Sequence, residues 1–137
     1  MKSTLWLAAG MLLLTLACNK DDSSSNCEKL VGKWEATSWK EDDEQFFGDT
    51  IFIISSEIEF KTQTERQGDF DWKINYTLGG LQDVIGSYVV NESCDEVTIT
   101  PKAGAPTTYS FSFDGDKLTM ETHDFNVHVV QEYIRSE

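Results

Sequence analysis

The chain has 137 residues and a formal net charge of −13, from 24 Asp and Glu side chains against 11 Lys and Arg. This acidity excludes nucleic acid as a partner, because phosphate binding requires clustered Lys and Arg side chains. Two Pro, nine Gly and 12% aromatic residues are typical of a folded chain. The length suits one domain and is too short for two, and we expect that domain to be a monomer.

The N-terminal segment, residues 1–17, is predicted to be a signal peptide. Lys2 is its only charged residue, and an apolar stretch follows that is too short and too N-terminal for a transmembrane helix. Residues 14–18 read Leu-Thr-Leu-Ala-Cys, which resembles the lipobox of bacterial lipoproteins, although that family favours Leu where Thr15 stands. The resemblance implies that Cys18 is acylated, by palmitate for example, as the first residue of the mature chain. The alternative is an ordinary secretory signal with Cys18 incidental.

The acylated Cys and the polar residues after it, residues 18–26, are predicted to form a flexible tether, since Asn19 to Asn26 includes no apolar residue. The order Cys18-x-Lys20-Asp21-Asp22 resembles the export signal of Gram-negative bacteria that display lipoproteins at the cell surface. A solvated linker without such a role is the alternative. We therefore expect a protein that is lipid-anchored in the outer membrane, with the cell surface favoured, since two or more acyl chains hold a protein on a membrane.

Two cysteines remain once Cys18 is assigned to the anchor. Cys27 and Cys94 form an even pair in an oxidising compartment, which predicts a disulfide bond. The alternative is a pair of buried free thiols, because sequence alone supplies no geometry.

The rest of the chain, residues 27–137, is predicted to be an all-β domain. Phe70, Trp72, Ile74 and Tyr76 alternate with polar residues, as in a strand with one buried face. Strands are predicted at 31–40, 51–61, 69–77, 84–91, 95–100, 107–113, 117–122 and 126–134, with the register of 84–91 and 126–134 left open. Short strands joined by turns favour a barrel or a sandwich. Closure into an eight-stranded antiparallel up-and-down barrel leaves no exposed edge.

A family resemblance supports the barrel. Leu30-Val31-Gly32-Lys33-Trp34 resembles the Gly-x-Trp opening of lipocalins and of bacterial lipocalin-like lipoproteins, and Arg135 ends the last predicted strand as in many lipocalins. The resemblance implies that Arg135 packs across Trp34 near the closed end of the barrel. Phe113-Asp114-Gly115-Asp116 stands where many lipocalins carry Thr-Asp-Tyr, which places the chain nearer the divergent bacterial relatives.

The predicted binding site is the rim formed by residues 41–50, 78–83, 101–106 and 123–125. These longer, more apolar connections share one end of such a barrel, and loops carry function more often than strands do. A small apolar or amphipathic ligand is expected there. The alternative is a structural or protein-interaction module with a filled barrel, because the inward residues are bulky. The predicted ligand-binding residues are Phe46, Phe47, Ile58, Trp72, Tyr109 and Phe111, whereas alternation places Trp39 on the face opposite to Trp34.

Catalytic and metal chemistry is not predicted. His123 and His128 are the only histidines, and their spacing of five predicts that they point to opposite faces and cannot share a metal. The acidic run 41–44 lacks the Asp-x-Asp-x-Asp-Gly spacing of a calcium loop. We therefore expect neither an enzyme nor a bound metal or cofactor.

Overall fold

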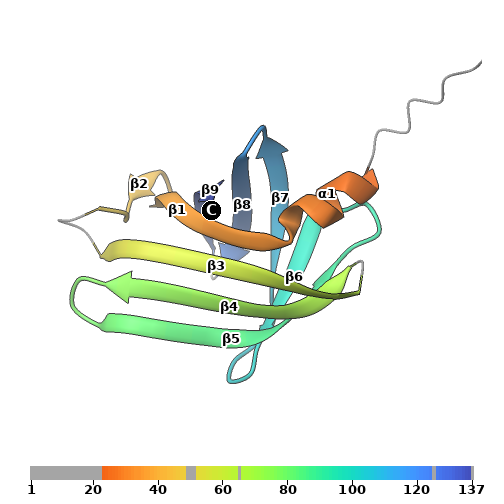
Figure 1. Cartoon of the computed structure of the whole chain (residues 1–137). Coiled ribbons are helices and arrows are strands. Elements are labelled where there is room, and N and C mark those ends of the chain that lie inside the picture. The colour runs from red at the N-terminus through yellow and green to blue at the C-terminus, as the bar shows by residue number, and fades with distance from the viewer. Residues whose placement is uncertain (1–22, 49–51, 65, 125, 137) are drawn as a thin grey trace, which may run out of the picture.

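A computed structural model describes residues 23–48, 52–64, 66–124 and 126–136 of the chain (Figure 1). Cys18 and the predicted signal peptide lie outside these residues. No helix within the described ranges is long and apolar enough to cross a membrane. The elements are α1 (Ser23–Leu30), β1 (Gly32–Glu41), β2 (Glu44–Gln45), β3 (Ile53–Thr64), β4 (Gln67–Tyr76), β5 (Gly80–Val90), β6 (Glu96–Pro101), β7 (Thr107–Asp114), β8 (Lys117–Asp124) and β9 (Val127–Arg135).

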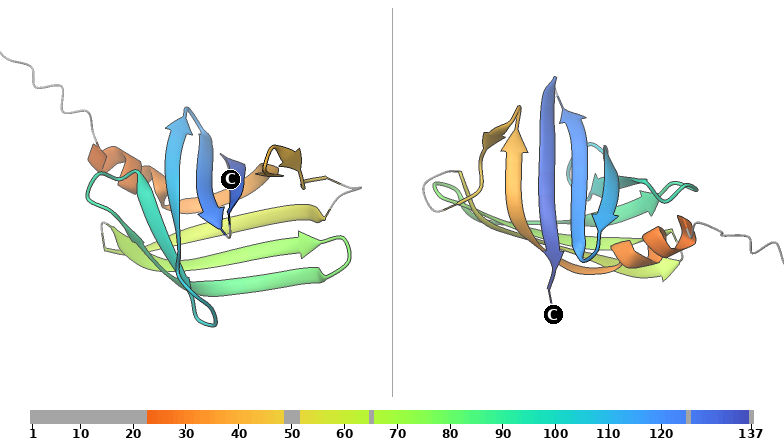
Figure 2. Two further views of the ribbon diagram at one scale, coloured as in Figure 1. Left: turned by 180° about the vertical axis from the view of Figure 1, so that it is seen from behind. Right: turned by 90° about the horizontal axis from the view of Figure 1, so that it is seen from above.

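The strands form one antiparallel sheet that closes on itself. From β3 to β9 each strand pairs with the next along the chain, β1 pairs with β3, and a further β1–β9 pairing closes the barrel. The short β2 pairs only with the end of β1, outside the ring of eight. Figure 2 shows β3, β4 and β5 as a long curved wall, with β7, β8 and β9 rising across from it. The predicted eight-stranded up-and-down barrel is therefore confirmed.

Most strand boundaries lie within three residues of the prediction, and two differences bear on the rim and the tether. Strand β5 begins at Gly80, so residues 80–83 are not loop, because Gly80 to Asp83 pair with Tyr76 to Lys73 of β4. Helix α1 begins at Ser23, inside the segment predicted to be a tether. Tertiary contacts account for this short helix, since Leu30 is fully buried against the barrel and Cys27 is bonded to the β5–β6 turn.

The closed half of the barrel contains the most deeply buried large side chains. Trp34, Phe60, Leu118 and Tyr133 are all at most 1% exposed, from strands β1, β3, β8 and β9. Cys27 and Cys94 are bonded there, with their Cα atoms 5.1 Å apart, so the predicted disulfide is confirmed. The bridge joins α1 to the turn between β5 and β6.

The predicted arrangement of Arg135 over Trp34 is also present at the closed end. The guanidinium carbon lies 4.3 Å from the centre of the indole, and the guanidinium donates hydrogen bonds to the carbonyls of Val31 (3.1 Å) and Lys29 (2.6 Å). The Trp34 indole donates to the carbonyl of Leu30 (2.8 Å). Gly32 has φ +126°, and a Cβ there would lie 2.5 Å from the Arg135 guanidinium, so a side chain at position 32 would displace the arginine.

A β-bulge in β1 overturns the prediction for Trp39. Ala36 pairs with Tyr133 and Ser38 pairs with the adjacent Glu132, which leaves Thr37 as the extra residue. A bulge of this kind reverses the alternation of the residues after it. Trp39 therefore lies on the same inner face as Trp34 and is buried.

Candidate ligand-binding site at the open end

The open end of the barrel is formed by the β1–β3, β4–β5, β6–β7 and β8–β9 connections, as the strand order requires. The opposite end holds the other turns, α1 and the disulfide. Figure 1 shows α1 beside the β5–β6 connection and away from β2, which lies at the open end. The chain therefore enters the barrel from the closed end, and the predicted rim lies at the other.

Three aromatic rings form a cluster just inside the open end. Trp39 of β1 stacks on Trp72 of β4, with ring centres 5.8 Å apart and planes inclined by 28°. Tyr109 of β7 packs edge-on against Trp72, with ring centres 6.3 Å apart. Each of the three is 7–8% exposed, against 0–2% for the largest core residues of the closed half. Together with the half-buried Tyr76, these rings form the inner aromatic surface of the open half.

Polar side chains are buried below and beside this cluster. Ser56, Thr122 and Gln131 face the interior in the middle or open half of their strands, whereas the fourth buried polar residue among those described, Ser38, pairs with Glu132 on the outer face under Gln45. The Trp72 indole donates to the Ser56 hydroxyl (2.8 Å), and the Tyr133 hydroxyl donates to the Gln131 side-chain oxygen (2.9 Å). Buried polar groups are costly unless they are paired, so these hydrogen bonds hold the side chains in fixed positions.

The phenols inside the barrel stay protonated at neutral pH. Burial, together with the nearby Asp124 carboxylate and Tyr76, raises the pKa of Tyr109 to about 12. Burial also raises the pKa of Tyr133 strongly. Both hydroxyls are therefore hydrogen-bond donors rather than bases. The interior of the open half combines apolar rings with neutral polar groups, which suits an amphipathic molecule.

The segment after β1 is folded against the rim by one glutamine. The Gln45 side-chain oxygen accepts from the backbone N–H groups of Trp39 (3.1 Å) and Phe47 (3.3 Å), and its amide donates to the Ser38 hydroxyl (3.2 Å). Phe46 donates its backbone N–H to the carbonyl of Trp39 (2.7 Å). Phe46 and Phe47 are consequently half-buried against the edge of the core.

The six predicted ligand-binding residues fall into two groups. Trp72 and Tyr109 are in contact inside the open end, and Phe46 and Phe47 lie at its rim. Ile58 instead pairs with Trp34 and Trp72 in the middle of the barrel and is fully buried. Phe111 packs edge-on against Phe113, which in turn contacts Trp34. Ile58 and Phe111 therefore have positions suited to core packing.

Trp39 is the site residue that the sequence prediction missed. A bulge is set by strand pairing, and period-2 alternation cannot show it. Among the predicted rim residues, Leu78 is exposed in the β4–β5 turn, whereas Leu81 is exposed within β5. Phe125 and residues 49–50 lie outside the described residues.

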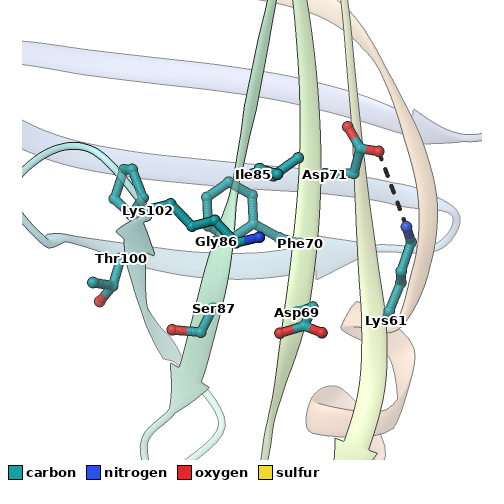
Figure 3. A pocket seen from close by; sticks show the side chains of 10 residues that line it. Lys61, Asp69, Phe70, Asp71, Ile85, Gly86, Ser87, Thr100 and Lys102 are labelled. Atoms are coloured by element: carbon teal, nitrogen blue, oxygen red, sulfur yellow. Dashed lines mark ion pairs between the residues drawn. The ribbon is translucent and has the colours of Figure 1, made fainter.

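A groove of about 650 Å³ lies on the outer wall of the barrel, across β4, β5 and β6 (Figure 3). Its charged lining includes Lys61, Asp69, Asp71 and Lys102, with Lys61 within 4.0 Å of the Asp71 carboxylate. At the groove β6 passes close to Gly86 of β5, where a Cβ would lie 2.1 Å from the carbonyl oxygen of Thr100. This polar outer groove is separate from the aromatic cluster inside the barrel.

The two histidines do not lie as predicted. His123 of β8 and His128 of β9 are direct cross-strand partners, so their side chains share one face of the hairpin. On a single strand, a spacing of five would place the two side chains on opposite faces. The chain turns between β8 and β9, however, so the two histidines face each other across the strand pair. Within the described residues, no group of three or more His, Cys, Asp or Glu side chains is arranged to hold a metal ion.

Comparison with known proteins identifies the fold and no closer relationship. No family model and no curated protein matches the chain. A redesigned β-barrel, b11L5F_LGL, aligns with a TM-score of 0.61 at 12% identity over 82% of this chain and 96% of that one. The redesigned barrel mFAP0, bound to DFHBI, aligns with a TM-score of 0.56 at 15% identity, over 78% of this chain and 99% of that one. The siderocalin Ex-FABP, which functions through dual ligand specificities, aligns with a TM-score of 0.55 at 11% identity, over 79% of this chain and 74% of that one.

These alignments span most of each chain at identities that carry information on the fold alone. The chain is therefore an all-β protein with a lipocalin-like eight-stranded barrel.

Proposed function

We propose that this protein is a non-enzymatic, lipid-anchored protein of the bacterial outer membrane, displayed at the cell surface. In this proposal its barrel binds a small apolar or amphipathic ligand at the open end. The observation that carries the binding proposal is the combination of the Trp39–Trp72–Tyr109 cluster with buried polar side chains in the same half of the barrel. Aromatic walls with a few fixed polar groups are typical of small-molecule sites.

The direction of the chain supports the orientation of the proposed anchor. Helix α1 and the Cys27–Cys94 bridge lie at the closed end, and the segment with Cys18 precedes α1. An anchor at Cys18 would therefore connect to the barrel from the end opposite to the aromatic cluster. The proposed site would face away from the membrane, where a ligand from outside reaches it.

We expect Cys18→Ser to abolish acylation and release the protein from the membrane, because acyl chains at about 0.8 kcal/mol per buried CH₂ supply the whole attachment. The measurement is detergent-phase partitioning of cell fractions together with the intact mass of the purified protein. Ser3→Ala, inside the predicted signal peptide, is the control and should leave partitioning unchanged. A Cys18→Ser protein that still partitions with the membrane fraction would contradict the anchor.

We expect an environment-sensitive apolar dye to bind the soluble domain with micromolar affinity at best. Trp39→Ala and Trp72→Ala should each weaken binding by about tenfold, since losing a stacked ring costs about 0.5–1.5 kcal/mol beyond its buried area. Fluorescence titration of the dye measures this, with melting curves to establish that each variant is folded.

Ile85→Ala is the matched control for the dye experiment. Ile85 lies on the outer face of β5, is 44% exposed and lines the outer groove. Its replacement should leave dye binding unchanged. If Ile85→Ala weakens dye binding as much as Trp72→Ala does, the dye adsorbs on the outer wall, and the proposed site at the open end is wrong.

A second candidate function is a filled barrel that acts through its outer surface. The bulky, fully buried residues of the core and the groove on the outer wall favour it. Native mass spectrometry of the protein purified from its own membrane distinguishes the two. A co-purified small molecule that Trp72→Ala loses supports the ligand-binding barrel, and a protein mass with no adduct together with no dye binding supports the filled barrel.

A further inference from the structure

Both histidines of the chain meet on the outer wall near the open end. His123 of β8 and His128 of β9 are register partners, and their rings stack with centres 4.6 Å apart and planes inclined by 14°. Both lie on the outer face, because Met120 and Thr122 of β8 and Gln131 of β9 alternate with them and are buried. The chain has two His, so every imidazole it possesses lies in this pair.

A carboxylate completes the cluster. Glu121 is two residues before His123 on the same face of β8, and its Oε2 lies 3.2 Å from Nε2 of His128. Side chains at i and i+2 of one strand and at the facing position of the next form a compact group on a sheet surface. Glu121, His123 and His128 thus bring two imidazoles and one carboxylate to one patch, which we call the histidine patch.

The backbone beneath the histidine patch is held firmly. Strands β8 and β9 pair without a register shift from Lys117 to Asp124. On its other side, His128 donates its backbone N–H to the Asp42 carboxylate (2.9 Å) and accepts from the Asp42 N–H (2.8 Å). Little conformational freedom of the backbone is therefore left to lose when the two rings bind a common ligand, which favours binding.

The spacing of the rings suits a shared metal ion. With Zn–N distances of about 2.0–2.1 Å and tetrahedral angles, two ligating nitrogens lie roughly 3.4 Å apart. The nitrogen lone pairs lie in the ring planes, so the stacked rings, whose centres are 4.6 Å apart, bind one ion by rotating about their side-chain bonds until two nitrogens converge. Imidazole is a good ligand for Zn²⁺, Ni²⁺ and Cu²⁺, whereas Ca²⁺ and Mg²⁺ prefer oxygen.

We propose that His123 and His128 together bind one divalent ion of the zinc, nickel and copper class on the outer wall of the barrel. The two imidazoles are the protein ligands, water fills the remaining positions, and Glu121 accepts a hydrogen bond from that water. No third protein side chain is already in place as a ligand in the described part of the chain, so the site is open to solvent and exchangeable. This proposal is independent of the ligand site inside the barrel.

The test is titration of the untagged domain, residues 19–137, with Ni²⁺ and Zn²⁺ by isothermal calorimetry at pH 7.5. We expect one ion per chain, and we expect His123→Gln and His128→Gln each to weaken binding by about tenfold or more, because either variant removes the chelate. Since the chain carries a net charge of −13, its carboxylates supply a background of weak cation binding. Titration with Ca²⁺ measures that background.

Two further variants make the result decisive. Glu57→Gln removes an outward carboxylate of β3 that pairs with Lys33 far from the patch, and it should leave Ni²⁺ binding unchanged. Glu121→Gln should weaken binding less than loss of either histidine. The proposal is overturned if the histidine variants bind Ni²⁺ as tightly as the parent, if Ca²⁺ competes on equal terms, or if the parent binds no Ni²⁺ or Zn²⁺ beyond the Ca²⁺ background.

Discussion

Reduction of the Cys27–Cys94 bridge should lower the melting temperature of the domain by about 10–20 °C. The bridge joins residues 67 positions apart, and closing so long a loop in the unfolded chain is worth about 4 kcal/mol in the chain-entropy model. For a domain of this length, each kcal/mol shifts the melting temperature by roughly 4 °C. Thermal unfolding followed by circular dichroism, with and without reductant, measures the effect.

A Cys27→Ala/Cys94→Ala double variant is the control for this reduction experiment. It should melt near the temperature of the reduced parent, and reductant should not change it. Both cysteines are at most 4% exposed, so part of any loss in the variant comes from packing rather than from the cross-link. A change of less than about 2 °C on reduction of the parent would show that the bridge contributes little to the fold.

Trp34→Ala should destabilise the domain by about 3–5 kcal/mol, the usual cost of removing a large buried aromatic ring. Trp34 is 1% exposed, and its indole donates a hydrogen bond to the Leu30 carbonyl. Its ring centre lies 5.7 Å from that of Phe113, and the Arg135 guanidinium lies over the ring. Its loss removes a cation–π contact worth about 0.5–2 kcal/mol together with the packing of the closed end. Urea denaturation of the parent and the variant measures the difference.

Trp39→Ala provides the comparison for Trp34→Ala, since it removes the same side chain from the other end of the same strand. Trp39 is 8% exposed and stacks on Trp72. We expect a smaller loss, because water can enter the space left at the open end, whereas the space left by Trp34 is enclosed. Equal losses in the two variants would contradict the division into a closed core and an open, solvent-reached cluster.

Local patterns in the sequence determined the strands and the closed end. In β4, Phe70, Trp72, Ile74 and Tyr76 face inward, because a strand without a bulge turns alternate side chains to opposite faces. The disulfide followed from the cysteine count, and the Arg135–Trp34 contact followed from a family resemblance; the structure has both. The strands themselves depend on local patterns, which alternation and turn residues are enough to indicate.

Only the tertiary structure decided which residues occupy the open end and the outer wall. Trp39 faces inward because β1 pairs with β3 and with β9 and accommodates Thr37 as a bulge. His123 and His128 face each other because β8 and β9 pair in one particular register. A shift of one residue, in a bulge or in a register, moves a side chain to the other face. Period-2 alternation describes each strand by itself, so it cannot show a property that arises from the pairing of two strands.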